Sequence, residues 1–304
     1  MKILIMGAGA IGAYYGARLQ QAGEDVTFCA RGAHLRALQS QGLSVTSPLG
    51  DFHLPVTAVA EPSQHQPYDL IIFCVKSNDT EAAIAQCQGC LAADGMVLTI
   101  QNGVENEGRL IASFGAGAVL SGNARIGAEL TGPGHVRHSA AGYIEFGELD
   151  GTISGRAQKL ADTMGRAGIL GALSDKIRDL RWEKLMWNAT FNTICALARC
   201  TVGRVLDDPR GLELVRQMLE EVRMVAGAEG ARIGPERTDA LLAFTRKHFY
   251  TNRPSTLQDL ERGRRMEVEA LIGVVVRLAR LHNLAVPASQ TIYALLSLAN
   301  PTPV

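Results

Sequence analysis

The sequence predicts a doubly wound α/β domain followed by an all-α domain, and three observations support this prediction. The first half alternates short apolar runs with helical patterns, as parallel sheets covered by helices require. A glycine-rich turn directly follows the first apolar run. The second half has a helical periodicity almost throughout. We therefore expect two domains, residues 1–171 and 172–304, with a cleft between them.

The first domain is expected to hold buried strands with helices between them. The apolar runs predict strands at residues 3–6, 26–29, 70–75, 97–100 and 119–122. Helical periodicity predicts helices at residues 11–21, 33–39, 79–88 and 106–114. Residues 127–147 predict a β-hairpin, because Gly132-Pro133-Gly134 lies between short alternating runs.

The second domain is expected to consist of helices. Its apolar period predicts helices at residues 175–197, 212–229, 236–249 and 264–283. The boundaries of these helices are marked by Pro254, Gly263 and Pro287.

Composition and charge exclude several classes of function. The 304 residues include 30 Lys+Arg and 30 Asp+Glu, so there is no basic excess to bind a nucleic acid. The apolar runs are too short for a signal peptide or a membrane span, which predicts a cytosolic protein without a membrane partner. Cys87 and Cys90 form a CxxC pattern, but Cys195 and Cys200 are wrongly spaced to complete a zinc site. No metal is therefore expected.

The pattern GxGxxG lies between the first strand and the first helix. Gly7 permits a tight turn, Gly9 leaves room for a pyrophosphate, and Gly12 lets the helix pack against the strand. The free N–H groups of the helix N-terminus would face the phosphates. This context predicts a Rossmann-type dinucleotide site rather than an ordinary glycine-rich turn. Its predicted residues are Gly7, Ala8, Gly9, Ala10, Ile11 and Gly12.

The ends of the next strands distinguish NAD from NADP. An acidic residue after the second strand would hold the ribose 2′-hydroxyl, but the strand meets Arg31, whose guanidinium can bind a 2′-phosphate. Lys76 follows the 70–75 strand and could add a second positive charge, with a solvated surface lysine as an equal alternative. These features predict NADP(H) as the cofactor. Asn102 follows another strand and could contact nicotinamide and substrate, although a lone Asn-Gly is also typical of a simple turn.

Lys184, Asn188 and Asn192 are spaced by four and again by four, so they share one face of a predicted helix. Amide and amine side chains are costly to bury in an apolar core, yet the residues around them in the sequence are apolar. We interpret this stripe as the wall of a polar cleft, with a solvated surface stripe as the alternative.

A second polar cluster follows in the helical half. Asn252 and Ser255 are expected in a loop before a helix, and Glu267 near the start of the next helix. From periodicity alone, acids in a first helical turn are the stronger interpretation of Glu267. In the reduction of a 2-keto acid, a lysine ammonium can polarise the carbonyl and donate a proton, while a carboxylate orients the lysine.

The order and spacing of these motifs are those of one known family. They are Gly7 to Gly12, Val75-Lys76, Gln101-Asn102-Gly103, Glu129 to Gly134, Trp182-Glu183-Lys184 with Asn188, and Ser255 to Asp259 with Glu267. In them the chain resembles ketopantoate reductase (2-dehydropantoate 2-reductase) over residues 1–287. The resemblance implies NADPH-dependent reduction of 2-dehydropantoate to pantoate, a step towards coenzyme A.

The resemblance also implies roles for individual residues. Lys184 matches the proton donor of the family, and Glu267 matches its acidic partner near cofactor and substrate. The implied substrate-contacting residues are Asn102, Lys184, Asn188, Asn192, Asn252 and Ser255. The implied cofactor contacts outside the glycine turn are Arg31, Lys76, Asn102, Ala128 and Glu267.

Two departures leave alternatives open. Val202 stands where some members of the family have asparagine, and Thr256 stands where methionine is common. Reduction of another small 2-keto acid is therefore the nearest alternative, since pocket shape discriminates weakly between such substrates. A non-catalytic NADP-sensing protein is a further alternative, because fold alone does not determine function. A hydroxyisobutyrate-type dehydrogenase fits the cluster from Gln258 to Glu267 less well. The helical half is compatible with a homodimer.

Overall fold

The computed structural model describes residues 1–65 and 67–301, so residues 302–304 of the predicted second domain lie outside the described part. The chain divides into two compact units. Unit 1 comprises Met1–Gln101 and Asn106–Ile177, and unit 2 comprises Asn102–Glu105 and the chain from Arg178 onward. The predicted fold class, a Rossmann-type domain followed by an all-α domain, is confirmed. The division differs from the predicted one, because it falls after residue 177 and transfers the short segment after residue 101 to unit 2.

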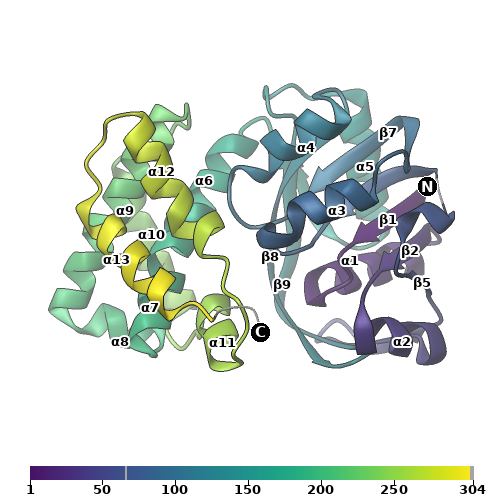
Figure 1. The fold of residues 1–304 in the computed structure, drawn as a ribbon, viewed down its shortest axis with the longest axis horizontal. Helices are drawn as coiled ribbons and strands as arrows, with labels where there is room; N and C mark the ends of the chain where they lie inside the picture. Colours follow the sequence, from purple (N-terminus) through teal and green to yellow (C-terminus); the bar gives the residue numbers. More distant parts are fainter. Residues whose placement is uncertain (66, 302–304) are drawn as a thin grey trace. The chain divides into compact units, whose positions relative to one another are not determined.

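Unit 1 is an α/β unit (Figure 1). Its strands are β1 (Lys2–Met6), β2 (Asp25–Cys29), β3 (Leu43–Thr46), β4 (Phe52–Leu54), β5 (Thr57–Val59), β6 (Tyr68–Phe73), β7 (Leu91–Thr99), β8 (Val119–Gly132), β9 (His135–Gly147) and β10 (Leu170–Leu173). Its helices are α1 (Ala10–Gln21), α2 (Gly32–Gln41), α3 (Thr80–Gln86), α4 (Asn106–Phe114) and α5 (Gly155–Arg166), with 3-10 turns η1 (Pro62–His65) and η2 (Ser77–Asp79).

One 10-stranded sheet organises unit 1, in the order β4-β3-β9-β8-β7-β6-β1-β2-β5, with β10 paired to β9. The strands from β8 through β7, β6, β1 and β2 to β5 are parallel. From β1 the chain reaches β2 on one side and β6 on the other, so the order reverses at β1. In doubly wound sheets, ligands bind at the carboxyl ends of the strands at such a point.

Alternating residues of the central strands form the cores on the two faces of the sheet. Ile3 and Ile5 belong to the apolar cluster that includes α1 and α5, whereas Leu4 and Met6 belong to the cluster that includes α3 and α4. Successive side chains of a strand point to opposite faces, so a strand buried on both faces must be apolar at every position. This explains why these strands are continuous apolar runs in the sequence.

The hairpin predicted for residues 127–147 is confirmed, as β8 and β9 are antiparallel partners. The hairpin is longer than predicted, because β8 continues from the strand expected at residues 119–122 to Gly132. Gly134 in the turn has φ +75°, which glycine adopts without strain. Strands β3, β4, β5 and β10 were not predicted, because each has only three or four residues and depends on pairing with distant segments.

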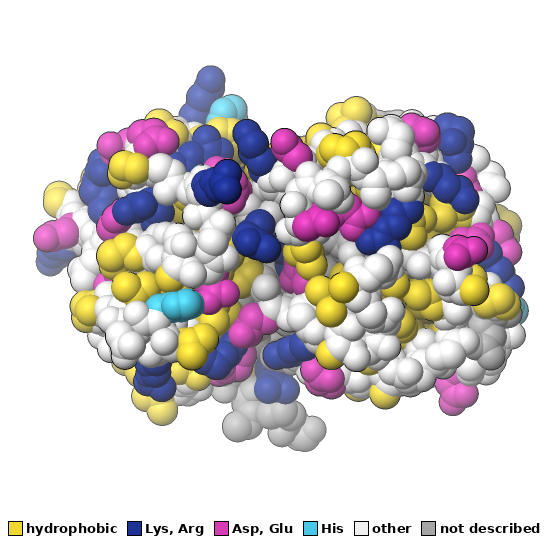
Figure 2. Space-filling view, turned by 90° about the horizontal axis from the view of Figure 1, so that it is seen from above, with side chains coloured by type: hydrophobic (Ala, Val, Ile, Leu, Met, Phe, Trp, Pro, Cys, Tyr) yellow, Lys and Arg dark blue, Asp and Glu magenta, His cyan; other side chains and the backbone are white. Residues whose placement is uncertain are grey.

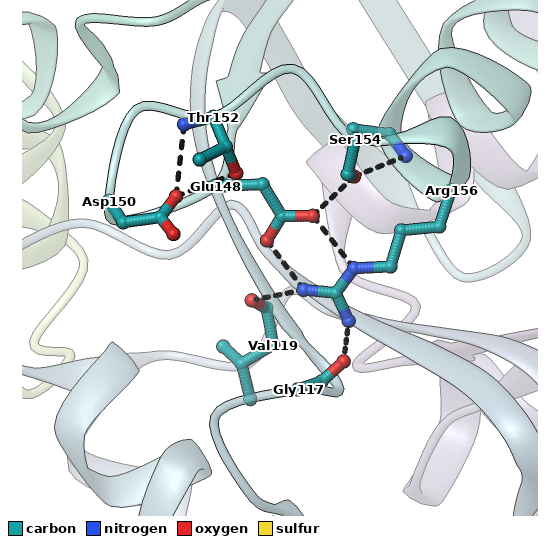
Figure 3. Close-up of polar contacts among 8 residues, drawn as sticks. Gly117, Val119, Glu148, Asp150, Thr152, Ser154 and Arg156 are labelled. Atoms are coloured by element: carbon teal, nitrogen blue, oxygen red, sulfur yellow. Dashed lines mark hydrogen bonds and ion pairs between the residues drawn. The ribbon is translucent and has the colours of Figure 1, made fainter.

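The connection from β9 to α5 is held by a buried carboxylate (Figure 3). Glu148 is 8% exposed and accepts hydrogen bonds from Ser154 Oγ at 2.5 Å and Arg156 Nε at 2.7 Å. Arg156 also donates to the carbonyls of Gly117 and Val119 at the start of β8. The Ser154 side chain in turn accepts from the Ala157 N–H and caps α5.

Unit 2 is helical. Its elements are α6 (Ile177–Trp187), η3 (Asn188–Asn192), α7 (Thr193–Ala198), α8 (Val202–Asp207), α9 (Pro209–Ala228), α10 (Glu236–His248), α11 (Ser255–Glu261), η4 (Glu269–Gly273), α12 (Val274–Leu281) and α13 (Pro287–Ala299). Both η3 and η4 are π-helical turns inside longer helices. The helix expected at residues 264–283 begins only at Val268, and α8 and α13 were not predicted.

Charged side chains of both signs are mixed on the face of the molecule that Figure 2 shows. Lys and Arg alternate with Asp and Glu on the face drawn in Figure 2, in keeping with a formal net charge of zero. Within the described residues, no helix is both long enough and apolar enough to cross a membrane.

Candidate functional site

A glycine turn joins β1 to α1 at the carboxyl edge of the sheet. Gly7 has φ +98°, and Gly9 is the N-cap of α1. The Ala8 N–H donates to the Cys29 carbonyl at 2.8 Å, which ties the turn to the end of β2. The turn therefore holds the N-terminus of α1 beside the ends of two adjacent strands.

The three glycines of the motif differ in the space around them. A Cβ at Gly7 would lie 2.7 Å from the backbone nitrogen of Val75, and a Cβ at Gly12 would lie 2.8 Å from Ile5 Cγ2. A Cβ at Gly9 would meet nothing within 4 Å. Gly7 and Gly12 thus allow close packing on the strands, while Gly9 lies open. A pyrophosphate bound at a helix N-terminus requires this arrangement, so the turn fits a dinucleotide.

The turn opens into a pocket of about 310 Å³ at the ends of β1, β2 and β6. This is the point where the strand order reverses. The residues that line the pocket are Met6, Gly7, Ala8, Gly9, Cys29, Ala30, Arg31, His34, Cys74, Val75, Lys76, Asp79 and Leu130.

Arg31 and Lys76 both line this pocket. Arg31 is exposed and is the N-cap of α2, while Lys76 is half-buried between β6 and η2. The structure thus brings together the two cations that the sequence predicts for NADP, although β1 lies between their strands. In the described part of the chain, Ala128 on β8 is not among the lining residues, whereas Leu130 is.

His34 and Asp79 also line the pocket, and neither was predicted from the sequence. Burial lowers the pKa of His34, and its Nδ1 accepts a hydrogen bond from the Gly134 N–H at 3.0 Å. Both features favour a neutral ring. His34 follows Arg31 by three positions and Asp79 follows Lys76 by three, and this helical spacing is the signal that could have found them.

The short segment after β7 packs on unit 2. Asn102 Nδ2 donates to Glu267 Oε2 at 3.3 Å, so two motif residues 165 positions apart are in contact. The Arg181 guanidinium donates to the Gly103 carbonyl. Gly103 has φ +90°, and a Cβ there would lie 2.9 Å from the Ala270 carbonyl oxygen. Asn102 and Gly103 are therefore both held to other residues of unit 2.

A continuous helical path through α6, η3 and α7 carries Lys184, Asn188 and Asn192. Lys184 is half-buried in the last turn of α6. Asn188 and Asn192 begin and end the π-helical turn and are 8% and 2% exposed. The shared helix face predicted from the spacing assumed an α-helix, but a π turn holds more residues and rotates Asn192 relative to Asn188. Such turns are frequent at functional sites.

Other predicted residues gather around α11. Asn192 Nδ2 donates to Ser255 Oγ at 3.5 Å, and Asn192 Oδ1 is buried without a hydrogen-bond partner among the described residues. Ser255 is the first residue of α11 rather than part of the preceding loop. The Asn252 carbonyl accepts from the Val202 N–H at 3.1 Å, so one of the departures noted in the sequence contacts a predicted substrate residue.

The π turns η3 and η4 pack against each other. Because η4 begins two residues after Glu267, this packing brings the helix of Asn188 and Asn192 to the helix that follows Glu267. Hydrogen bonds join Asn102 to Glu267 and Asn192 to Ser255, while Lys184 lies one turn before Asn188.

The CxxC pattern lies in the core of unit 1. Cys87 and Cys90 are free thiols in the apolar cluster that includes α3, and burial raises the pKa of both. Among residues 1–65 and 67–301, no group of three His, Cys, Asp or Glu side chains is placed to hold a metal ion.

Comparisons with known proteins cover nearly the whole chain. The family model described as Ketopantoate reductase PanE/ApbA matches residues 3–151, and its C-terminal counterpart matches residues 176–300. The chain is 38% identical to a 2-dehydropantoate 2-reductase of Archaeoglobus fulgidus, over 91% of this chain and 90% of that protein.

Solved structures of the same shape support this likeness. A 2-dehydropantoate 2-reductase from Geobacter metallireducens has a TM-score of 0.92 and 34% identity, covering 99% of this chain and 100% of that one. A D-mandelate dehydrogenase, solved with NADH and anilino(oxo)acetate, has a TM-score of 0.92 and 25% identity, covering 98% of each chain.

Proposed function

Since the chain belongs to the ketopantoate reductase PanE/ApbA family, an oxidoreductase family, we propose that it reduces 2-dehydropantoate to pantoate with NADPH. The observation that carries the proposal is the contact between Asn102 and Glu267. It joins two residues that lie 165 positions apart in the chain and that the family resemblance assigns to substrate and cofactor.

The proposed chemistry needs a proton donor at the substrate carbonyl. NADPH, when bound, supplies the hydride that adds to the C2 carbonyl carbon. Lys184 donates a hydrogen bond to the carbonyl oxygen and then gives it a proton, so that an alcohol forms. In this proposal Glu267 orients the lysine ammonium, and Asn102 holds the Glu267 carboxylate in place. The amides of Asn188 and Asn192, with the Ser255 hydroxyl, position the polar groups of the substrate.

The pocket of unit 1 supports the choice of NADPH. Arg31 and Lys76 both line it beyond the glycine turn, where they would bind a 2′-phosphate through charge-assisted hydrogen bonds. Asp79 lines the same pocket. We expect Arg31→Ala to lower the preference for NADPH over NADH, and an unchanged preference would contradict the role of Arg31.

Reduction of another 2-keto acid remains a second proposal. The similarity to a D-mandelate dehydrogenase favours it, because that enzyme acts on an aromatic 2-hydroxy acid. Val202 and Thr256, the two departures from the family pattern, are both buried close to predicted substrate residues.

The first experiment is a turnover assay with purified protein and NADPH. The panel contains 2-dehydropantoate, 2-ketoisovalerate and phenylglyoxylate, and the loss of reduced nicotinamide absorbance is followed. Lys184→Ala should lower kcat by about 10²–10⁴-fold, the usual contribution of a general acid. The matched control is Lys247→Ala, an exposed lysine on α10.

Each outcome of this assay is informative. Turnover of 2-dehydropantoate that is lost only in Lys184→Ala supports both the reaction and the proton donor. Turnover of phenylglyoxylate alone supports the second proposal. Tight NADPH binding without turnover of any panel member would contradict both and favour a non-catalytic NADP-sensing protein.

A further inference from the structure

A buried polar network lies directly beneath Lys76 in unit 1. It joins the turn that carries Lys76 to the end of β7 and the start of α4. Its members are almost inaccessible, with exposed fractions of 6% for Ser77, 0% for Thr80, 5% for Gln101 and 3% for Asn106. Burying so many polar groups is costly unless they bond to one another, so the network has to be well satisfied to persist.

Hydrogen bonds of the network reach the residues on both sides of Lys76. Gln101 Nε2 donates to the Val75 carbonyl at 3.0 Å. Asn106 Nδ2 donates to Ser77 Oγ at 3.1 Å. The backbone before Lys76 and the side chain after it are thus both anchored to the interior of unit 1.

Thr80 connects these two anchors. Its hydroxyl accepts from Gln101 Nε2 at 2.8 Å and donates to Asn106 Oδ1 at 3.1 Å. One hydroxyl therefore orients both amides, because its acceptor side and its donor side are committed to different partners. Thr99 Oγ1 donates to Gln101 Oε1 at 3.1 Å and holds the far side of that amide.

An apolar side chain at position 80 could fill the same space but could not orient the two amides. Each amide would keep its other partners but would lose its hydrogen bond to Thr80, so the bonds from Gln101 to the Val75 carbonyl and from Asn106 to the Ser77 hydroxyl would be held less firmly. The peptide of Lys76 would shift, while the hydrogen bond from the Ala8 N–H of the glycine turn to the Cys29 carbonyl on β2 would remain.

We propose that Thr80 is a positioning residue for cofactor selection, which acts through Gln101 and Asn106 to hold Lys76 where its ammonium meets the 2′-phosphate of NADPH. The inference rests on the proposed use of NADPH and of Lys76. It assigns the buried network to the discrimination between NADPH and NADH and leaves the transfer of hydride and proton to other residues.

The test compares Thr80→Val, which keeps the shape and removes the hydroxyl, with Thr80→Ser, which keeps the hydroxyl. The readout is the ratio of kcat/KM for NADPH to kcat/KM for NADH. Thr80→Val should lower this ratio roughly tenfold, the effect expected when buried amides lose a hydrogen-bond partner. The ratio should fall because kcat/KM for NADPH falls, while kcat/KM for NADH stays nearly unchanged. Thr80→Ser should keep the ratio. Thr163→Val is the matched control, since it removes another buried hydroxyl, bonded to the Lys159 carbonyl on α5.

Lys76→Ala separates failure of this inference from failure of the proposed cofactor. In its background, Thr80→Val should cause little further loss, because residues that act through one another are not additive. If Lys76→Ala lowers the ratio and Thr80→Val leaves it unchanged, the inference is wrong and the cofactor proposal stands. If Lys76→Ala also leaves the ratio unchanged, the proposed role of Lys76 fails and the inference fails with it. Should Thr80→Val not fold, Ser77→Ala removes the partner of Asn106 and is expected to lower the ratio in the same way.

Discussion

Gly9, the N-cap of α1, and Gly12, three positions later within α1, have different surroundings. The Cβ position of Gly9 is open toward the pocket, whereas that of Gly12 is filled by Ile5 and neighbouring backbone. Gly9 therefore leaves space for a ligand, whereas Gly12 allows α1 to pack closely on β1.

Alanine at these two positions should separate binding from stability. Gly9→Ala should change the free energy of unfolding by less than about 1 kcal/mol, as expected at a helix N-cap, and weaken NADPH binding at least about tenfold. Gly12→Ala should lower the free energy of unfolding by about 1–3 kcal/mol through overpacking. Urea unfolding and NADPH titration measure the two effects. Normal NADPH affinity in Gly9→Ala would contradict the proposed pyrophosphate site.

At the scale of elements, Glu148 joins the end of β9, the cap of α5 and the start of β8 through Ser154 and Arg156 (Figure 3). Burial alone would raise the pKa of Glu148, but hydrogen bonds from Arg156 and Ser154 outweigh burial and leave the pKa below its ordinary value. A carboxyl group with a lower pKa in the folded state contributes stability above its unfolded pKa. That contribution is lost as the pH falls through the folded pKa.

Glu148→Gln tests this connection through the pH dependence of stability. At neutral pH the variant should be about 1–3 kcal/mol less stable, because Arg156 loses its charged partner. The difference between wild type and variant should shrink below the ordinary carboxyl pKa of 4.5, where Glu148 begins to be protonated in the unfolded chain. Urea unfolding at a series of pH values measures the difference. A difference that stays constant down to acid pH would show that the charge of Glu148 is unimportant.

At the scale of the molecule, the two units have separate apolar cores. The clusters built on the sheet belong to unit 1, and the cluster that extends from α6 to α13 belongs to unit 2. The pocket at the glycine turn, in which we propose that the phosphates of NADPH bind, is lined by residues of unit 1 alone. A ligand that binds only the folded state stabilises the part of the chain that forms its site.

NADPH should therefore raise the melting temperature of unit 1. At about 100 times its Kd, a ligand adds about 2.7 kcal/mol, which corresponds to a rise of roughly 5–10 °C for a unit of this size. NADH at the same concentration should raise the melting temperature less than NADPH does. The Arg31→Ala substitution should reduce the difference between the rises caused by the two cofactors. Differential scanning calorimetry measures these shifts. Equal shifts with both cofactors would contradict the proposed preference for NADPH.

Local patterns were sufficient to predict the order of most elements and the glycine turn. Strands buried on both faces are apolar at every position, so they can be recognised as apolar runs in the sequence. Glycines whose Cβ position is crowded cannot be replaced without destabilising the fold, so the glycine pattern can be recognised as well. The short strands β3 and β4 leave no such mark, because β3 is a strand only through its pairing with β9, far along the chain. The π turns at Asn188 and Glu269 likewise depend on packing rather than on spacing.

The sequence by itself determined the fold class and the residues whose side chains are capable of binding or catalysis, because both follow from periodicity and residue type. Only the tertiary structure decided which of those residues meet. It placed Asn102, which follows a strand of unit 1, in unit 2 against Glu267, and it put His34 and Asp79 in the pocket with Arg31 and Lys76. Contacts between residues so far apart depend on how helices and strands pack, and spacing along the chain does not encode that packing.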